Sequence, residues 1–186
     1  MTARIEPALT VADLEVMPDD GNRYEIIEGE IQVSRAPGLT HQSVSGNLFT
    51  SIKDYLRSEP IGEVWATPGI IFTDFNGVGP DLVYVSNERR RDIATGERIT
   101  GAPELVIEII SPEIDNERRD RVIKRQLYAK FAVKEYWIVD PVSRVIDIYR
   151  LEGETLKLAA TLGEDDELTS PVLPGYSCKV ASIFRL

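Results

Sequence analysis

Hydrophobic and polar positions follow two different periods along this chain, and together they predict a mixture of helices and strands. Helical spacing is clearest over residues 40–58, where one face carries Val44, Leu48, Ile52, Tyr55 and Leu56. Thr40 can cap this helix, which we expect to pack on a sheet. Two further helices are predicted over 10–17 and 116–131.

The expected strands are short and rich in β-branched residues, and they cover 23–28, 30–34, 62–66, 69–74, 81–86, 104–111, 135–140, 145–150 and 156–161. Two of them, around Leu105–Ile110 and Tyr136–Val139, are almost continuously apolar, which is typical of central strands covered on both faces. The helix 116–131 lies between these two strands along the chain. The order predicts an α/β (α+β) fold: a mixed central sheet flanked by helices, with an extra N-terminal hairpin and a C-terminal β hairpin.

The length of 186 residues predicts a single domain over 1–186. No apolar run approaches the roughly 18 residues of a membrane span, and the first residues lack a signal-peptide pattern, so we expect a cytoplasmic protein without a membrane partner. One cysteine, Cys178, and one histidine, His41, exclude an intrachain disulfide and a multi-histidine metal site.

The chain carries 21 basic and 31 acidic residues, a formal charge of −10, which argues against a uniformly basic nucleic-acid binder. Nevertheless 9 of the 21 basic residues fall within 86–125, and they include Arg89, Arg90, Arg91, Arg118, Arg119, Arg121, Lys124 and Arg125. They form either a local footprint for phosphate groups or ordinary solvated surface.

Three charged residues break the hydrophobic pattern. Glu108 lies inside an apolar strand, where an isolated carboxylate needs a partner unless it faces solvent near the strand end. Asp81 follows Pro80 and is either a turn residue or, with Glu108 on a neighbouring strand, one of two ligands of a magnesium ion. Lys124 occupies an apolar position of the helix 116–131, from which it either reaches those carboxylates or extends to solvent.

The order Pro80-Asp81, Glu108, Lys124 resembles the PD-(D/E)XK nuclease superfamily, and in particular the Uma-type family of bacterial restriction-endonuclease-like proteins. The similarity spans nearly the whole chain and lies in residues 23–30, 40–42, 80–86, 101–112 and 136–141, which read RYEIIEGE, THQ, PDLVYVS, GAPELVIEIISP and YWIVDP. The superfamily pattern has lysine two residues after the acidic strand residue. Here that position is Ile110, and Lys124 would supply the ammonium group instead.

The resemblance implies a restriction-endonuclease-like fold and a DNA endonuclease that depends on Mg²⁺ or Mn²⁺. Asp81, Glu108 and the main-chain carbonyl of Ile109 or Ile110 would hold the metal, and Lys124 would orient water or stabilise charge. Two further candidates are weighed against ordinary roles. Glu25 is an extra ligand or a hairpin surface residue, and His41 contacts phosphate or water, or caps and packs its helix.

Other functions remain open at this stage. A catalytically inactive binding or dimerisation module would keep the fold without the chemistry. A serine hydrolase is disfavoured, because the chain contains no Gly-x-Ser-x-Gly motif. Trp65 and Trp137 are expected mostly in the core rather than stacked on bases, and the acidic run 164–167 in a solvated loop rather than around calcium. A homodimer is expected if both DNA strands are cut, because two sites are then needed; the 145–161 hairpin offers an edge for pairing.

Overall fold

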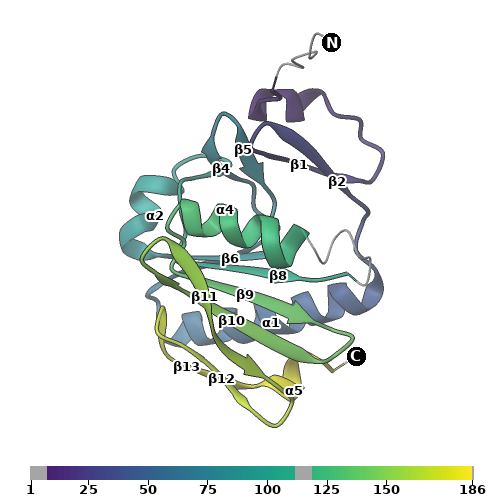
Figure 1. Ribbon diagram of the computed structural model, residues 1–186. Helices are drawn as coiled ribbons and strands as arrows, with labels where there is room; N and C mark the ends of the chain where they lie inside the picture. Colours follow the sequence, from purple (N-terminus) through teal and green to yellow (C-terminus); the bar gives the residue numbers. More distant parts are fainter. Residues whose placement is uncertain (1–7, 112–118, 186) are drawn as a thin grey trace.

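The computed structural model describes residues 8–111 and 119–185, and it contains a central six-stranded sheet (Figure 1). The spatial order of its strands is β11 (Thr155–Leu162), β10 (Val145–Glu152), β9 (Glu135–Asp140), β8 (Leu105–Ile109), β6 (Leu82–Ser86) and β3 (Gly62–Ala66). Only β8 and β9 pair in parallel, and the other neighbours in this sheet are antiparallel. The two apolar runs in the sequence are therefore the central strands, as predicted.

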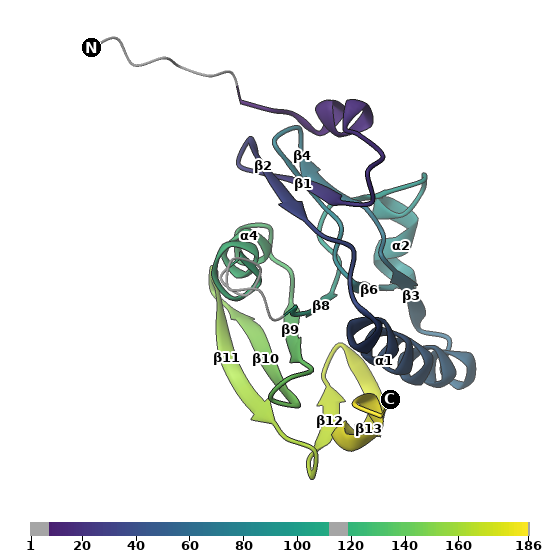
Figure 2. The same cartoon turned by 90° about the vertical axis from the view of Figure 1, so that its right-hand side faces the viewer.

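Helices cover both faces of this sheet. Figure 2 shows α1 (Leu39–Ser58) on one side, and on the other the helical segment made of a π-helical turn, η2 (Arg119–Lys124), and α4 (Arg125–Lys130). Because successive strand residues point to opposite faces, β8 contributes Leu105, Ile107 and Ile109 to the core beneath α1. Val106 belongs to the other core, with Leu127 and Tyr128 of α4 among its members. The helix predicted over 116–131 is thus confirmed from Arg119 onward, and its first residues lie outside the described part.

A second, five-stranded sheet holds the N-terminal hairpin. Its order is β2 (Glu30–Ser34), β1 (Arg23–Ile27), β5 (Asn76–Val78), β4 (Ile70–Thr73) and β7 (Ile99–Thr100). A 3₁₀-helical segment, η1 (Val11–Val16), lies beside it in both views. The expected strand 69–74 therefore belongs to this smaller sheet, where it pairs with β5 and β7. Gly77 and Gly79 separate it in the sequence from the expected strand 81–86, which belongs to the central sheet.

The C-terminal segment adds elements that the sequence pattern did not predict. After the β10–β11 hairpin, which was predicted, come β12 (Glu167–Ser170), β13 (Leu173–Lys179) and α5 (Val180–Ile183), which pack under α1. The short helix α2 (Asn87–Ile93) was also missed; Ser86 caps it by accepting a hydrogen bond from the Arg89 N–H. Among the described residues, no helix has both the length and the apolar character needed to cross a membrane.

Candidate functional site

The two carboxylates singled out by the sequence lie opposite each other on neighbouring strands. In the β6–β8 ladder Leu82 is paired with Ile107, so continuing the antiparallel register by one residue places Asp81 opposite Glu108. Both side chains are buried, at 3% and 2% exposure, and both line one cavity on the α4 side of the sheet. Asp81 is therefore not an exposed turn residue, and Glu108 does not face solvent.

Asp81 is held from three directions. Its Oδ2 accepts hydrogen bonds from the Ile109 N–H (2.8 Å) and lies 3.0 Å from His41 Nε2, while its Oδ1 accepts from Arg23 Nη1 (3.2 Å). Burial alone raises the pKa of Asp81, but the contacts with His41, Arg23 and Ile109 outweigh it, so its pKa lies below the usual value. Asp81 is thus an ionised, firmly oriented carboxylate.

Glu108 is bound to the helical segment that covers it. Its Oε1 accepts hydrogen bonds from Lys124 Nζ and from the Tyr128 hydroxyl, both at 2.8 Å. Burial raises the pKa of Glu108 to about 8; Lys124 opposes this shift, and the nearby carboxylates of Asp120, Asp81 and Glu25 add to it. The pKa of Glu108 therefore lies close to the neutral range, where the charge of this carboxyl group changes.

Lys124 is 1% exposed and lies among carboxylates instead of extending to solvent. Its Nζ is 2.9 Å from Glu25 Oε1, 2.8 Å from Glu108 Oε1 and 3.8 Å from Asp120 Oδ1. Burial lowers the pKa of Lys124, but these three carboxylates together raise it above the usual lysine value. The ammonium group therefore stays charged throughout the neutral range, and it can donate hydrogen bonds but not act as a base.

Glu25 is a buried member of the site and not a surface residue of the hairpin. Its Oε1 accepts hydrogen bonds from Lys124 and from the Gly79 N–H (2.8 Å), and its pKa is lowered because these contacts outweigh burial. Its other oxygen, Oε2, is buried and has no hydrogen-bond partner within the described residues. A buried acceptor without a donor is costly, so this atom indicates room for a further ligand, water or ion.

Asp120 and Tyr128 belong to the same cluster, and the sequence analysis did not assign either to it. Asp120 is 3% exposed and accepts from Arg119 Nε (3.1 Å); burial raises its pKa, although Lys124 and Arg119 oppose the shift. Both residues lie on the same side of the helical segment as Lys124, at i−4 and i+4. This spacing was the signal available in the sequence.

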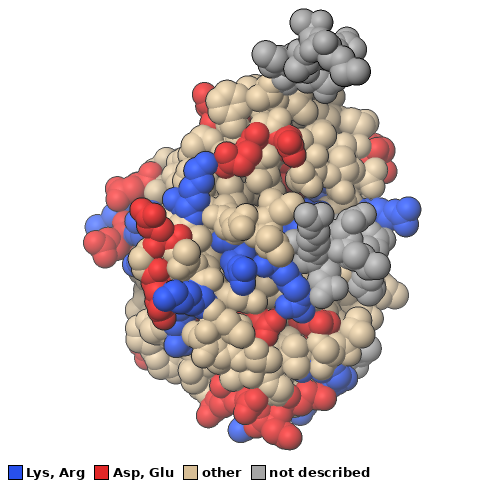
Figure 3. All heavy atoms as spheres, in the orientation of Figure 1, with Lys and Arg blue, Asp and Glu red and all other residues tan. Residues whose placement is uncertain are grey.

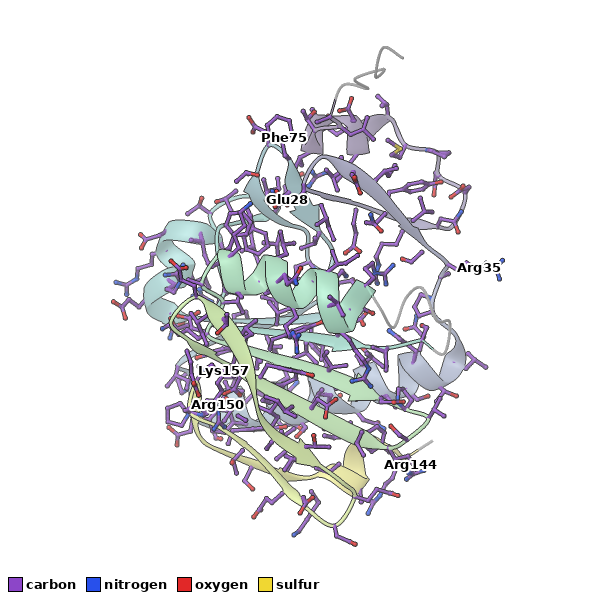
Figure 4. All side chains as sticks on the ribbon, viewed as in Figure 1. Glu28, Arg35, Phe75, Arg144, Arg150 and Lys157 are labelled. Carbon is purple, nitrogen blue, oxygen red and sulfur yellow. The ribbon has the colours of Figure 1, made fainter. Side chains whose placement is uncertain are left out.

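The arginines at the cavity differ from those predicted. Arg23, Arg35 and Arg119 line it, and Figure 4 shows Arg35 on the segment after β2, directed outward. Of the predicted set only Arg119 lies there. Three of the others have partners elsewhere: Arg121 pairs with Asp147 (2.7 Å), Arg125 stacks on the Tyr149 ring (5.1 Å) and Arg89 donates to the Ala102 carbonyl (2.7 Å). Neither Arg90 nor Arg91 lines the cavity. Arg118 lies outside the described residues.

The other predicted residues divide between the site and ordinary structure. His41 and Ile109 line the cavity, whereas Ile110 does not and packs in the core on the α4 side. Trp137 is fully buried and donates to Glu135 (2.7 Å), and Trp65 packs at the edge of a core, as expected. The run 164–167 forms a turn whose side chains pair with Arg144, Gly163 and Ser177.

The donor set fits a small hard cation. Four carboxyl groups (Glu25, Asp81, Glu108 and Asp120) lie beside the cations Arg23, Arg35, Arg119 and Lys124, and the cavity of about 20 Å³ has room for about one ion or water molecule. No group of three or more acidic, histidine or cysteine side chains in the described ranges is arranged to hold a metal ion as an all-protein site. Magnesium does not need one, because it is usually bound by one or two carboxylates and several waters.

Comparisons with known proteins identify the family and the fold of the chain. The family model Uma2, described as "Putative restriction endonuclease", matches residues 11–181. A solved structure described as a "putative nuclease belonging to DUF820" from Anabaena variabilis ATCC 29413 is 20% identical, with a TM-score of 0.76 over 95% of this chain and 97% of that one. The type IIG restriction endonuclease BpuSI gives a TM-score of 0.43 and 11% identity over 77% of this chain and 15% of its own. A search of curated proteins found no match. The expected restriction-endonuclease-like fold is confirmed.

Proposed function

The chain belongs to the Uma2 family of restriction-endonuclease-like proteins, and from this premise we propose that it is a DNA endonuclease dependent on Mg²⁺ or Mn²⁺. One observation carries the proposal: Asp81 and Glu108 line the same buried cavity from adjacent strands, with Lys124 Nζ 2.8 Å from Glu108. Two carboxylates at a small cavity, one of them paired with a buried lysine behind it, suit the hydrolysis of a phosphodiester. Neither an isolated buried carboxylate nor a buried lysine is tolerated without such partners.

In this mechanism Asp81, Glu108 and the Ile109 carbonyl would hold the metal. A bound divalent ion lowers the pKa of its water and offsets the charge of the phosphate. Arg23 and His41 fix the orientation of Asp81. Lys124 donates a hydrogen bond that orients the attacking water, and Arg119 at the rim binds a phosphate oxygen.

The test combines metal binding with cleavage. We expect Mg²⁺ to raise the Tm of the wild type, and this rise to disappear in Asp81→Asn together with metal-dependent cutting of plasmid and single-stranded DNA. The matched control is Asp54→Asn, the same substitution at an exposed pair with Arg57, which should keep both. Full cleavage by Asp81→Asn would refute the proposal.

A second candidate is a nuclease-fold module that binds DNA or dimerises without chemistry. It is favoured by Ile110 at the usual lysine position and by the cations that already pair with the carboxylates. This protein would bind DNA equally well with and without metal. It would cut none.

We also propose a homodimer for any form that cuts both strands. β11 is an edge strand of the central sheet, and its Leu158 is 55% exposed, so a second copy could pair along it. Arg150 and Lys157, visible at this hairpin in Figure 4, are charges of the kind that also protect an edge. Light scattering at micromolar concentration decides: a mass near 20.8 kDa with double-strand cleavage intact would refute the dimer.

A further inference from the structure

A second cavity adjoins the candidate site and has no role in the mechanism above. This cavity, the Arg98 groove, has a volume of about 260 Å³ and lies between η1 and the five-stranded sheet. Its walls include apolar side chains from both elements, such as Leu14 and Ile71, and the aromatic ring of Tyr24. This volume is close to that of the smallest pockets that bind small molecules, about 300 Å³. The groove is therefore of a size for one nucleoside and not for a longer segment.

The groove is connected to the candidate site through Arg23. This residue lines both cavities, and its Nη1 donates to the Gly79 carbonyl (2.9 Å) and to Asp81 Oδ1 (3.2 Å). Thr67 makes a second connection, because it lines the groove and its N–H donates to the Asp81 carbonyl (2.8 Å). Thr67 has φ of 49°, a rare conformation for a β-branched residue, and such strain is concentrated at functional sites.

The charge of the groove is opposite to that of the whole protein. Two arginines, Arg23 and Arg98, line it without any aspartate or glutamate, although the chain carries a net charge of −10. Arg98 is exposed, its stem lies over Gly69, and it makes no hydrogen bond or ion pair within the described residues. A guanidinium group with all its donors available beside an apolar cavity is suited to a ligand that is anionic at one end and flat and apolar at the other.

We propose that the Arg98 groove binds one unpaired nucleotide of the substrate strand, next to the phosphodiester that is cut. The base lies against Tyr24 and the apolar wall, and Arg98 binds the adjoining phosphate. This inference rests on the nuclease function proposed above and specifies its substrate: a base inside a duplex is stacked and paired, so the groove favours single-stranded or branched DNA.

The first test measures binding without cleavage. Fluorescein-labelled single-stranded and duplex oligonucleotides of equal length are titrated with the full chain in EDTA at several salt concentrations. We expect the wild type to prefer the single strand. Arg98→Ala should weaken that binding and reduce the slope of log K against log salt by about 0.7. Arg91→Ala is the matched control, because it removes the same charge from an exposed arginine that does not line the groove.

The second test places a charge inside the groove. Leu14→Glu should weaken single-strand binding by about tenfold, since it repels phosphate and displaces the base. Val16→Glu adds the same charge to the same 3₁₀-helical segment at a position that is 80% exposed and outside the groove, and should have little effect. Thermal melting of both variants shows whether Leu14→Glu still folds; if it does not, Arg98→Ala carries the test alone.

The outcomes separate this inference from the proposed function. If the wild type cuts DNA but binds duplex and single strand equally, or if Arg98→Ala matches Arg91→Ala in affinity and slope, the groove is not a nucleotide site and the nuclease proposal stands. If the wild type neither binds nor cuts DNA with Mg²⁺ or Mn²⁺, both proposals are wrong. A 2-aminopurine base whose fluorescence changes on binding to the wild type but not to Arg98→Ala would support the groove directly.

Discussion

The two faces of the central sheet are built from the same strands but carry different kinds of side chain. On β8 the residues facing α1, namely Leu105, Ile107 and Ile109, are all apolar and belong to the hydrophobic core beneath that helix. On the α4 side Glu108 stands between Val106 and Ile110, and Lys124 and Glu25 are buried against it. Figure 3 shows where most other charges are: on the surface, with acidic groups gathered at the lower end of this view. The apolar face stabilises the fold, whereas the buried ion pairs of the charged face add little net stability, because removing the charges from water offsets their attraction.

The largest effect should come from breaking the charged face. Lys124→Met removes the cation between two buried carboxylates and should lower the free energy of unfolding by about 3–5 kcal/mol, because the partners remain buried and unpaired. Denaturant unfolding measures this loss. Adding Glu108→Gln to Lys124→Met should restore part of it. A loss below about 1 kcal/mol in the single variant would mean that the cluster is open to water.

The apolar face should respond through packing alone. Leu48 of α1 is fully buried in the core beneath that helix, and Leu48→Ala should cost about 2–5 kcal/mol through the cavity that it leaves. Because Leu48 belongs to the core beneath α1 and does not line the cavity, the Tm increase caused by Mg²⁺ should keep its size when the variant is measured at a temperature where it is folded. A lost metal response would show that the two faces are coupled.

This contrast explains what could be predicted from the sequence. Glu108 and Lys124 were recognisable because each is a charge at a position where the period requires an apolar residue. Arg23 gave no such signal, since an arginine in a short hairpin strand resembles ordinary surface, and its contact with Asp81 joins residues 58 positions apart. Likewise the prediction for the arginines of 118–125 rested on how many there are. Which of them reaches the cavity depends on the direction in which each side chain leaves the helix.

The same reasoning applies to the fold. Strands and helices with a strong period were placed within a few residues, as in α1 and β9. β5 and β7 are only three and two residues long, too short to show any period, and they exist because neighbouring strands pair with them. The separation into two sheets was therefore not visible, because it depends on pairing between distant segments.

The pH dependence of the free energy of unfolding should also distinguish the charged face from the apolar one. The pKa of Glu108 is raised to about 8 in the folded protein, so between its unfolded value and pH 8 the folded state binds the extra proton. Stability from this group is present at low pH and is lost as the pH rises, by at most about 1.4 kcal/mol per pH unit and roughly 2 kcal/mol between pH 6 and 7.5. Unfolding of the metal-free protein in EDTA measures it. Glu108→Gln should remove this part of the slope, and an unchanged slope would assign it to other groups.

The smallest effect should come from the exposed counterpart of Lys124 on the same helical segment. Lys130 pairs with Glu28 at 2.8 Å, as Lys124 pairs with Glu108, but both partners are more than half exposed; Figure 4 shows Glu28 at the surface above α4. Water solvates either charge when the other is removed, so Lys130→Met should change the free energy of unfolding by less than about 1 kcal/mol. The substitution is the same as in Lys124→Met and the distance is the same, and only burial differs. Equal losses in the two variants would mean that burial does not set the energy of the Lys124 cluster.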